Sequence, residues 1–128
     1  MSTVANAQVG VLVVDDQHPF RRAMAAVVEE TDGFVVVGAA ASGEESVAAT
    51  AELSPDLVLM DVNLPGIDGI EAARQITARE SPPVVVLLST YDEDDFDRSG
   101  CGASAYISKA TFSPDRLQQL WSSATTAH

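Results

Sequence analysis

A chain of 128 residues, 46% of them apolar, is long enough for one hydrophobic core and too apolar for a disordered segment. The formal net charge of −12 argues against binding to nucleic acid or an anionic membrane, because a phosphate backbone needs a basic surface. The single cysteine, Cys101, excludes an internal disulfide and a cysteine-based zinc site, and it favours a reducing, cytoplasmic location.

Both ends of the chain are expected to lie outside the folded domain. Residues 1–8 are small and polar and lack the basic and apolar blocks of a signal peptide, so we interpret them as a flexible tail. The domain is expected to span residues 9–124, and residues 125–128 to form a short C-terminal tail. No apolar run approaches the ~20 residues that a membrane helix needs, so no membrane contact is expected.

Apolar runs alternate with helical patterns along the chain. Near-continuous apolar runs are typical of parallel strands that are covered on both faces. Strands are predicted at Val9–Val14, Phe34–Val37, Leu57–Met60, Val84–Leu88 and about Ala103–Ile107. Such a βα alternation with right-handed crossovers predicts an α/β fold with a doubly wound, five-stranded parallel sheet. The flavodoxin-like strand order 2-1-3-4-5 is the expected one.

Capping residues mark the helices between these strands. Pro19 opens the first helix, Ser42 with Glu45 forms a capping-box pattern for the second, and Ser113-Pro114 begins the last. Apolar residues at helical spacing predict the buried side of each helix. These residues are Phe20, Ala23, Met24, Val27 and Val28, then Val47, Ala48 and Ala51, then Ile70, Ala73 and Ile76, and finally Leu117, Leu120, Trp121 and Ala124.

The segment between the fourth and fifth strands fits a helix poorly. Residues 91–102 are rich in acidic side chains, and Phe96 is the one large apolar side chain in the helical part. Short helices depend on tertiary packing for their stability. A shortened, mobile fourth helix is therefore expected here.

Acidic side chains follow two strands that are expected to be neighbours. Asp15 and Asp16 come directly after the first strand, and Asp61 follows the third. Functional crevices of such sheets lie outside the carboxyl ends of the strands, where the chain direction switches. A hard cation relieves the repulsion of crowded carboxylates, and Mg²⁺ prefers oxygen ligands. We expect Asp16 and Asp61 to bind Mg²⁺ directly, Asp15 to bind through water, and the backbone carbonyl of Asn63 to add an oxygen.

The same edge carries the groups needed for phosphoryl transfer. A carboxylate can attack phosphorus and form an aspartyl phosphate, which predicts Asp61 as the phosphoacceptor. Lys109 supplies a positive charge there, and the hydroxyl of Ser89 can donate a hydrogen bond to a phosphoryl oxygen. Each residue alone has a simpler explanation: a strand-end hydroxyl, a solvated loop lysine, or a cap for the next helix. Their joint position favours a site.

Four motifs together make the chain resemble a response-regulator receiver domain of two-component signalling, CheY-like in fold. The motifs are Val13-Val14-Asp15-Asp16, Leu59-Met60-Asp61 with the Asn63-Leu64-Pro65-Gly66 turn, Leu88-Ser89-Thr90, and Ala105-Tyr106-Ile107-Ser108-Lys109. Residues 16–21 and 68–72 resemble the NarL/LuxR-type subfamily. The resemblance covers the chain from Val9 to about Ala124.

The resemblance implies a function for each matching residue. Asp61 takes a phosphoryl group from a sensor histidine kinase, Asp15 and Asp16 hold Mg²⁺ (or Mn²⁺), and Lys109 pairs with the phosphate. Ser89 and Tyr106 form a switch in which the hydroxyl turns toward the phosphoryl group and the ring follows inward. Asn63 and Tyr91 border the site and are candidates for setting the lifetime of the phosphorylated form.

The output of the receiver has two open readings. NarL/LuxR-type regulators carry a DNA-binding domain of roughly 60 further residues, which would lie beyond His128. The alternative is a stand-alone receiver that acts through protein partners without DNA binding. A second copy of the chain is an open partner in either case. We expect no enzyme activity beyond the chain's own phosphorylation and dephosphorylation.

Three other functions fit the sequence less well. A haloacid-dehalogenase-like phosphatase needs an acid two residues after the nucleophile, where this chain has Asn63. An FMN-binding flavodoxin-like module needs a hydroxyl- and glycine-rich loop after the first strand, where Asp15 and Asp16 would repel the phosphate. A degenerate receiver that only binds partners is disfavoured by the intact set of acids.

Overall fold

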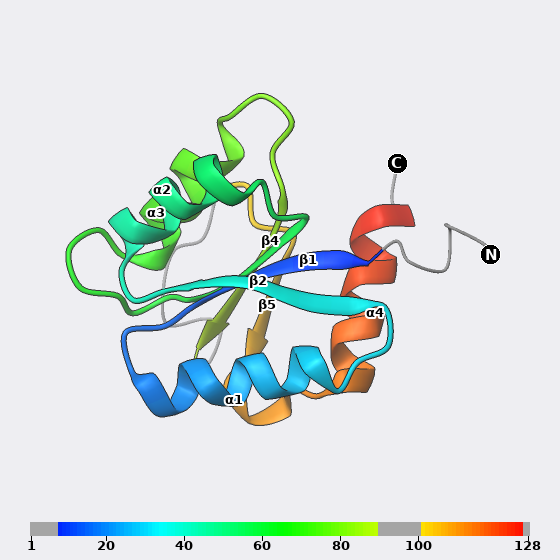
Figure 1. Cartoon of the computed structure of the whole chain (residues 1–128). Coiled ribbons are helices and arrows are strands. Elements are labelled where there is room, and N and C mark those ends of the chain that lie inside the picture. Colours follow the sequence, from blue (N-terminus) through cyan, green and yellow to red (C-terminus); the bar gives the residue numbers. More distant parts are fainter. Residues whose placement is uncertain (1–7, 90–100, 127–128) are drawn as a thin grey trace.

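A computed structural model describes residues 8–89 and 101–126, which form a parallel sheet with helices on both faces (Figure 1). The strands are β1 (Val9–Val14), β2 (Phe34–Ala40), β3 (Leu57–Asp61), β4 (Val84–Ser89) and β5 (Ala105–Ser108). The helices are α1 (His18–Glu29), α2 (Gly43–Leu53), α3 (Gly69–Thr77), the 3₁₀ turn η3 (Lys109–Thr111) and α4 (Pro114–Thr126). The five strands lie in the order β2-β1-β3-β4-β5, which confirms the predicted fold class and order.

Two hydrophobic cores lie on opposite faces of the sheet. In β1, Leu12 and Val14 face the core shared with α3, whereas Val11 and Val13 face the core shared with α1 and α4. Because side chains alternate along a strand, a strand buried on both faces must be apolar at every position. All five residues of β3 are buried, as are the last five of β4, so the ends of these strands are held firmly in the centre of the molecule.

The helix starts follow the predicted capping residues. The hydroxyl oxygen of Ser42 accepts the backbone N–H of Glu45 at 3.1 Å, and the hydroxyl of Ser113 accepts that of Arg116 at 3.2 Å. Asp68 caps α3 by accepting the N–H of Glu71 at 2.8 Å. Each of these bonds satisfies a backbone donor that the helix itself leaves unpaired. The cap at Asp68 also fixes where α3 begins relative to the end of β3.

The predicted buried side of α2 is wrong for Ala48 and Ala51, which are exposed. Val47 is half-buried and packs against the core, and Ser46 and Thr50 are buried. The hydroxyl of Thr50 donates to the carbonyl of Ser46 at 2.8 Å. Ser46 donates in the same way to the carbonyl of Gly43 at 2.6 Å. With their donors satisfied inside the helix, these small side chains can be buried at little cost.

The remaining predictions about chain segments are not tested. Tyr91 and all but the last two residues of the segment expected to form a shortened helix, 91–102, lie outside the described residues, and α4 is the C-terminal helix. Residues 1–7 and 127–128 are also outside the described part, and α4 runs to Thr126. No helix in the described ranges is long and apolar enough to cross a membrane, and the cytoplasmic location stays a prediction.

Gly69 allows α3 to pack directly against the end of β3. A Cβ atom at this position would lie 2.2 Å from the carbonyl oxygen of Asp61 and 2.8 Å from Cα of Val62. Both atoms belong to the backbone, so they cannot move aside as a side chain would. We expect Gly69→Ala to lower the free energy of unfolding by about 1–3 kcal/mol, measured by urea denaturation.

Gly38→Ala is the matched control. Its added Cβ would meet the Cδ1 atom of Leu53 at 2.5 Å, but Leu53 is 41% exposed and can rotate away. This substitution should therefore change the stability much less than Gly69→Ala. Equal effects of the two substitutions would contradict the proposed close packing at Gly69.

Candidate functional site

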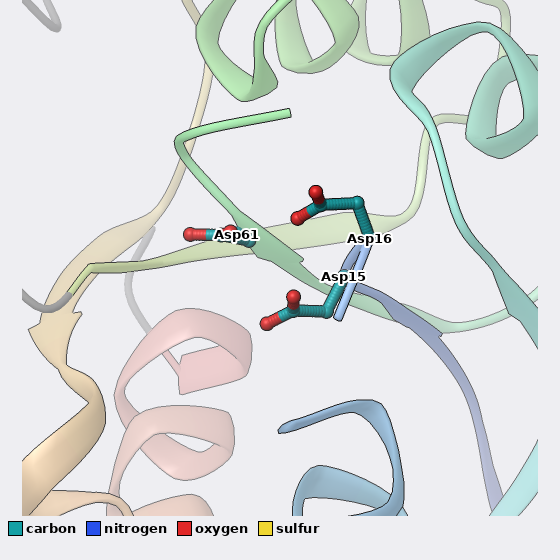
Figure 2. A group of neighbouring side chains, drawn as sticks. All are labelled: Asp15, Asp16 and Asp61. Atoms are coloured by element: carbon teal, nitrogen blue, oxygen red, sulfur yellow. The ribbon is translucent and has the colours of Figure 1, made fainter. Parts of the chain in front are cut away.

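Three carboxylates meet at the carboxyl end of the sheet. Asp15 and Asp16 follow β1, and Asp61 is the last residue of β3, the neighbouring parallel strand. One oxygen atom from each carboxylate lies within 4.8 Å of the others. Figure 2 shows the three side chains projecting from the two strand ends into the same space. The topology alone thus brings together acids that are far apart in the sequence.

The three acids differ in their surroundings. Asp15 is fully buried and Asp61 is 5% exposed, whereas Asp16 is exposed to solvent. Oδ1 of Asp15 accepts the backbone N–H of Gln17 at 2.9 Å, and its Oδ2 accepts the ammonium of Lys109 at 2.7 Å. Asp15 therefore already has partners on both oxygens, and the exposed carboxylate of Asp16 faces the solution.

Lys109 reaches the acids from the end of β5. It begins η3 directly after β5, and its Nζ lies 2.7 Å from Oδ2 of Asp15 and 3.6 Å from Oδ2 of Asp61. Its side chain is only 10% exposed. Because one ammonium lies between two carboxylates that are both largely removed from water, their attraction is screened much less than it would be at the surface.

Two contacts of the site were missed by the sequence analysis. Nζ of Lys109 lies over the ring of Phe20, 4.0 Å from its centroid. The helical spacing predicts Phe20 in the buried stripe of the first helix, but it is 38% exposed and lies at the site instead. Nη1 of Arg21 donates to the backbone carbonyl of Asp15 at 2.7 Å. The available signal was that α1 starts almost directly after the acidic pair, so its first turn must lie beside the strand end.

Burial raises the pKa of Asp61 above its usual value. Loss of water around the carboxyl group is the largest cause, and the charges of Asp15 and Asp16 add to it. The ammonium of Lys109 and the backbone N–H of Asn63 act in the opposite direction. Removing a carboxylate from water disfavours its charged form. A further positive charge near Asp61 would therefore stabilise its ionised carboxylate.

The other predicted residues lie at different depths. Ser89 ends β4, is 1% exposed and follows Leu88, which is the partner of Asp61 in the β3–β4 ladder. The N–H of Val62 donates to the carbonyl of Leu88 at 3.0 Å, which continues the ladder past Asp61. Tyr106 lies further back in β5 opposite Leu87, with its hydroxyl oxygen buried and its ring against the core on the α2–α3 side.

Asn63 lies at the exposed edge of the site. Its backbone N–H donates to Oδ1 of Asp61 at 3.3 Å. Its predicted function as a carbonyl ligand stays a prediction, and so does the function of Tyr91, which lies outside the described residues.

The donor set fits a hard divalent cation. Three carboxylates and one ammonium leave a formal charge of −2, and the oxygen atoms of the acids lie within 4.8 Å of one another. Such an oxygen-only cluster suits Mg²⁺, Mn²⁺ or Ca²⁺ better than a metal that prefers nitrogen or sulfur. Two of the acids are buried, so a cation would also compensate for their lost hydration.

The fold is a doubly wound α/β domain with an acidic cluster at the carboxyl end of its sheet, and comparison with known proteins gives the family. Residues 11–121 match the family described as response regulator receiver domain, and the chain belongs to it. It is 39% identical over 112 residues to the response regulator GacA of Pseudomonas viridiflava. It is 38% identical over 103 residues to the transcriptional regulatory protein LiaR of Bacillus subtilis. These matches cover 86% and 79% of this chain but only 52% and 49% of the relatives. The chain thus spans about half of their length.

Solved structures support the subfamily. The signal receiver domain of the response regulator NarL from Mycobacterium tuberculosis has a TM-score of 0.84 and 26% identity, with 94% of this chain and 98% of that chain covered. A LuxR-family response regulator from Aurantimonas sp. has a TM-score of 0.81 and 29% identity, with 92% and 86% covered. The predicted resemblance to NarL/LuxR-type receivers is confirmed.

The raised pKa of Asp61 predicts a pH-dependent effect of removing its charge. Between the usual pKa of 3.8 and the raised value in the folded protein, the native state binds more protons than the unfolded state. The stability therefore falls as the pH rises through this window. In metal-free buffer we expect Asp61→Asn to raise the melting temperature at pH 7. The gain should disappear as the pH falls toward and below 3.8, measured by thermal unfolding.

The exposed Asp32 provides the control, since Asp32→Asn should leave the melting temperature nearly unchanged over the same pH range. A melting temperature of Asp61→Asn at or below that of the wild type at pH 7 would show that the charge of Asp61 does not destabilise the folded state.

Proposed function

We propose that this receiver takes a phosphoryl group from a sensor histidine kinase onto Asp61 in a Mg²⁺-dependent reaction. The main support is the environment of Asp61: a carboxylate with 5% exposure that shares one space with Asp15, Asp16 and the ammonium of Lys109. A solvated surface aspartate would have none of these neighbours. The family of the chain supports the same function.

The transfer is a substitution at phosphorus. A carboxylate oxygen of Asp61 attacks the phosphorus of a phosphohistidine, a P–O bond forms and the P–N bond breaks. The electron pair of the broken bond stays on the imidazole nitrogen, which takes up a proton from solvent. The rate of such a reaction depends mainly on how the reacting groups are positioned and on how the charge of the phosphoryl group is neutralised.

The residues around Asp61 have distinct functions in this proposal. Lys109, at 3.6 Å from Oδ2 of Asp61, pairs with a phosphoryl oxygen, while Asp15 keeps the ammonium in place. Asp16 and Asp61 would hold Mg²⁺ directly, Asp15 through water, and Asn63 through its carbonyl. The bound ion, or Mn²⁺ in its place, supplies positive charge to the phosphoryl oxygens.

Ser89 and Tyr106 are proposed to transmit the change. Ser89 is at the end of the strand beside Asp61, so its hydroxyl can turn toward a phosphoryl group there. Tyr106 lies on β5, the neighbouring edge strand, with its hydroxyl oxygen already buried. A movement at the end of β4 would therefore change the packing of the ring and with it the surface formed by β5.

We propose that this chain is the regulatory half of a longer NarL/LuxR-type transcriptional regulator. The support is that relatives about twice as long include a transcriptional regulatory protein, and that similar structures include a LuxR-family regulator. A stand-alone receiver that acts through protein partners is the alternative. Sequencing the gene beyond the codon of His128 separates the two. A second copy of the chain as partner stays a prediction.

Phosphorylation can be tested without a kinase. With Mg²⁺ and a small acyl phosphate or phosphoramidate, intact-protein mass spectrometry should show the addition of one phosphate. Asp61→Asn should abolish it, and so should removal of Mg²⁺ with a chelator, because the nucleophile or the neutralising charge is lost. Asp68→Asn is the matched control: Asp68 lies in the same loop but is exposed and caps α3, so labelling should persist. Labelling of Asp61→Asn would move the phosphoacceptor elsewhere.

The proposed switch predicts a spectroscopic change at two residues. Phosphorylation of Asp61 should shift the amide resonance of Ser89 and the ring resonances of Tyr106 in NMR spectra, because both are expected to change position. Tyr106→Phe should retain the shift at Ser89, since the hydroxyl of Ser89, not the side chain of Tyr106, contacts the phosphoryl group. Unchanged resonances at both residues in a fully phosphorylated sample would count against the switch.

A further inference from the structure

The ammonium of Lys109 is enclosed on three sides by groups from separate parts of the chain. Oδ2 of Asp15 lies at 2.7 Å and Oδ2 of Asp61 at 3.6 Å, and the face of the Phe20 ring lies at 4.0 Å from Nζ to centroid. Together they leave the lysine side chain only 10% exposed. A lysine near a protein surface ordinarily keeps its ammonium in water, so this enclosure needs an explanation.

Phe20 reaches the lysine from an unusual place. It lies in the first turn of α1, is 38% exposed and is one of the few large apolar side chains in the described part of the chain with that much contact with solvent. An apolar cavity of about 120 Å³ adjoins it, bounded by α1, the end of β4, Lys109 and Phe112. The ring therefore does not fill the core. Its face instead contacts the charged side chain of Lys109.

We propose that Phe20 is a positioning residue that holds the ammonium of Lys109 within reach of a phosphoryl group on Asp61. This role rests on the proposed function. An aromatic face attracts a cation without competing for the hydrogen atoms that the ammonium donates to oxygen. The attraction persists to about 6 Å from the ring centroid. Nζ can therefore shift from Asp15 toward Asp61 and stay in contact with the ring.

The physical benefit is preorganisation. A free lysine side chain has many rotamers, and ordering it during the reaction would add to the barrier. By closing the open side of the ammonium, the ring also excludes water that would screen its charge from a phosphoryl oxygen. An aliphatic side chain of similar size would fill the space but would offer no π face.

The test uses three variants of the full chain and a small phosphodonor, so that no kinase surface is involved. Phe20→Leu removes the π face and should slow phosphorylation about threefold to tenfold at saturating Mg²⁺ and donor. Phe20→Tyr keeps the face and should retain the wild-type rate. Phe112→Leu is the matched control, because it removes a ring from the same cavity and should leave the rate unchanged.

An NMR signal separates positioning from a general effect on structure. In the unphosphorylated protein, the ring current of Phe20 should shift the Hε protons of Lys109 upfield in wild type, Phe20→Tyr and Phe112→Leu, but not in Phe20→Leu. Thermal unfolding checks that all variants are folded. A wild-type rate for Phe20→Leu, an equal loss in Phe112→Leu, or no ring-current shift in the wild type would each overturn the proposal.

The two proposals fail in different ways. If the wild-type chain takes no phosphate, the proposed function is wrong, while the ring-current shift still decides whether Phe20 holds Lys109. If phosphorylation proceeds on Asp61 at the same rate with and without the ring, the function stands and the positioning role is refuted.

Discussion

The central constraint in this molecule is the repulsion among three carboxylates confined to one edge of a sheet. Asp15 and Asp61 are almost fully buried, and Asp16 lies within reach of both. One ammonium, that of Lys109, offsets part of this charge. A formal charge of −2 remains within a few ångströms, which is why this edge favours cations and groups that bring cations with them.

The rest of the fold keeps these charges from moving apart. The strands that carry them are buried on both faces, and the helix after each strand is fitted closely to its end. Arg21 binds the carbonyl of Asp15 from α1, and Gly69 lets α3 rest on the carbonyl of Asp61. These contacts hold the backbone in place at Asp15 and Asp61, the two buried acids. Stability elsewhere in the domain compensates for an unfavourable arrangement here, as is common for functional sites.

The sequence was sufficient for the architecture and for the polar residues at the strand ends. Uninterrupted apolar runs identify strands covered on two faces, and parallel strands bring their carboxyl ends to one edge, so Asp15, Asp16, Asp61 and Lys109 could be placed together before any coordinates. It was insufficient for helix faces. Alanine and serine differ little in size, so apolar spacing alone does not show that Ser46 and Thr50, whose hydroxyls donate inside α2, are buried and that Ala48 and Ala51 are exposed. The predicted burial of Phe20 was wrong for a related reason. Helical spacing shows which residues share one face of a helix, but it does not show how far along the helix that face is covered by the core.

The backbone bond from the N–H of Val62 to the carbonyl of Leu88 joins the residue after one strand end to the residue before the next. Asp61 and Ser89 are thereby separated by a single peptide-to-peptide link instead of by a flexible loop. The position of one strand end relative to its neighbour is therefore fixed through the backbone as well as through side chains.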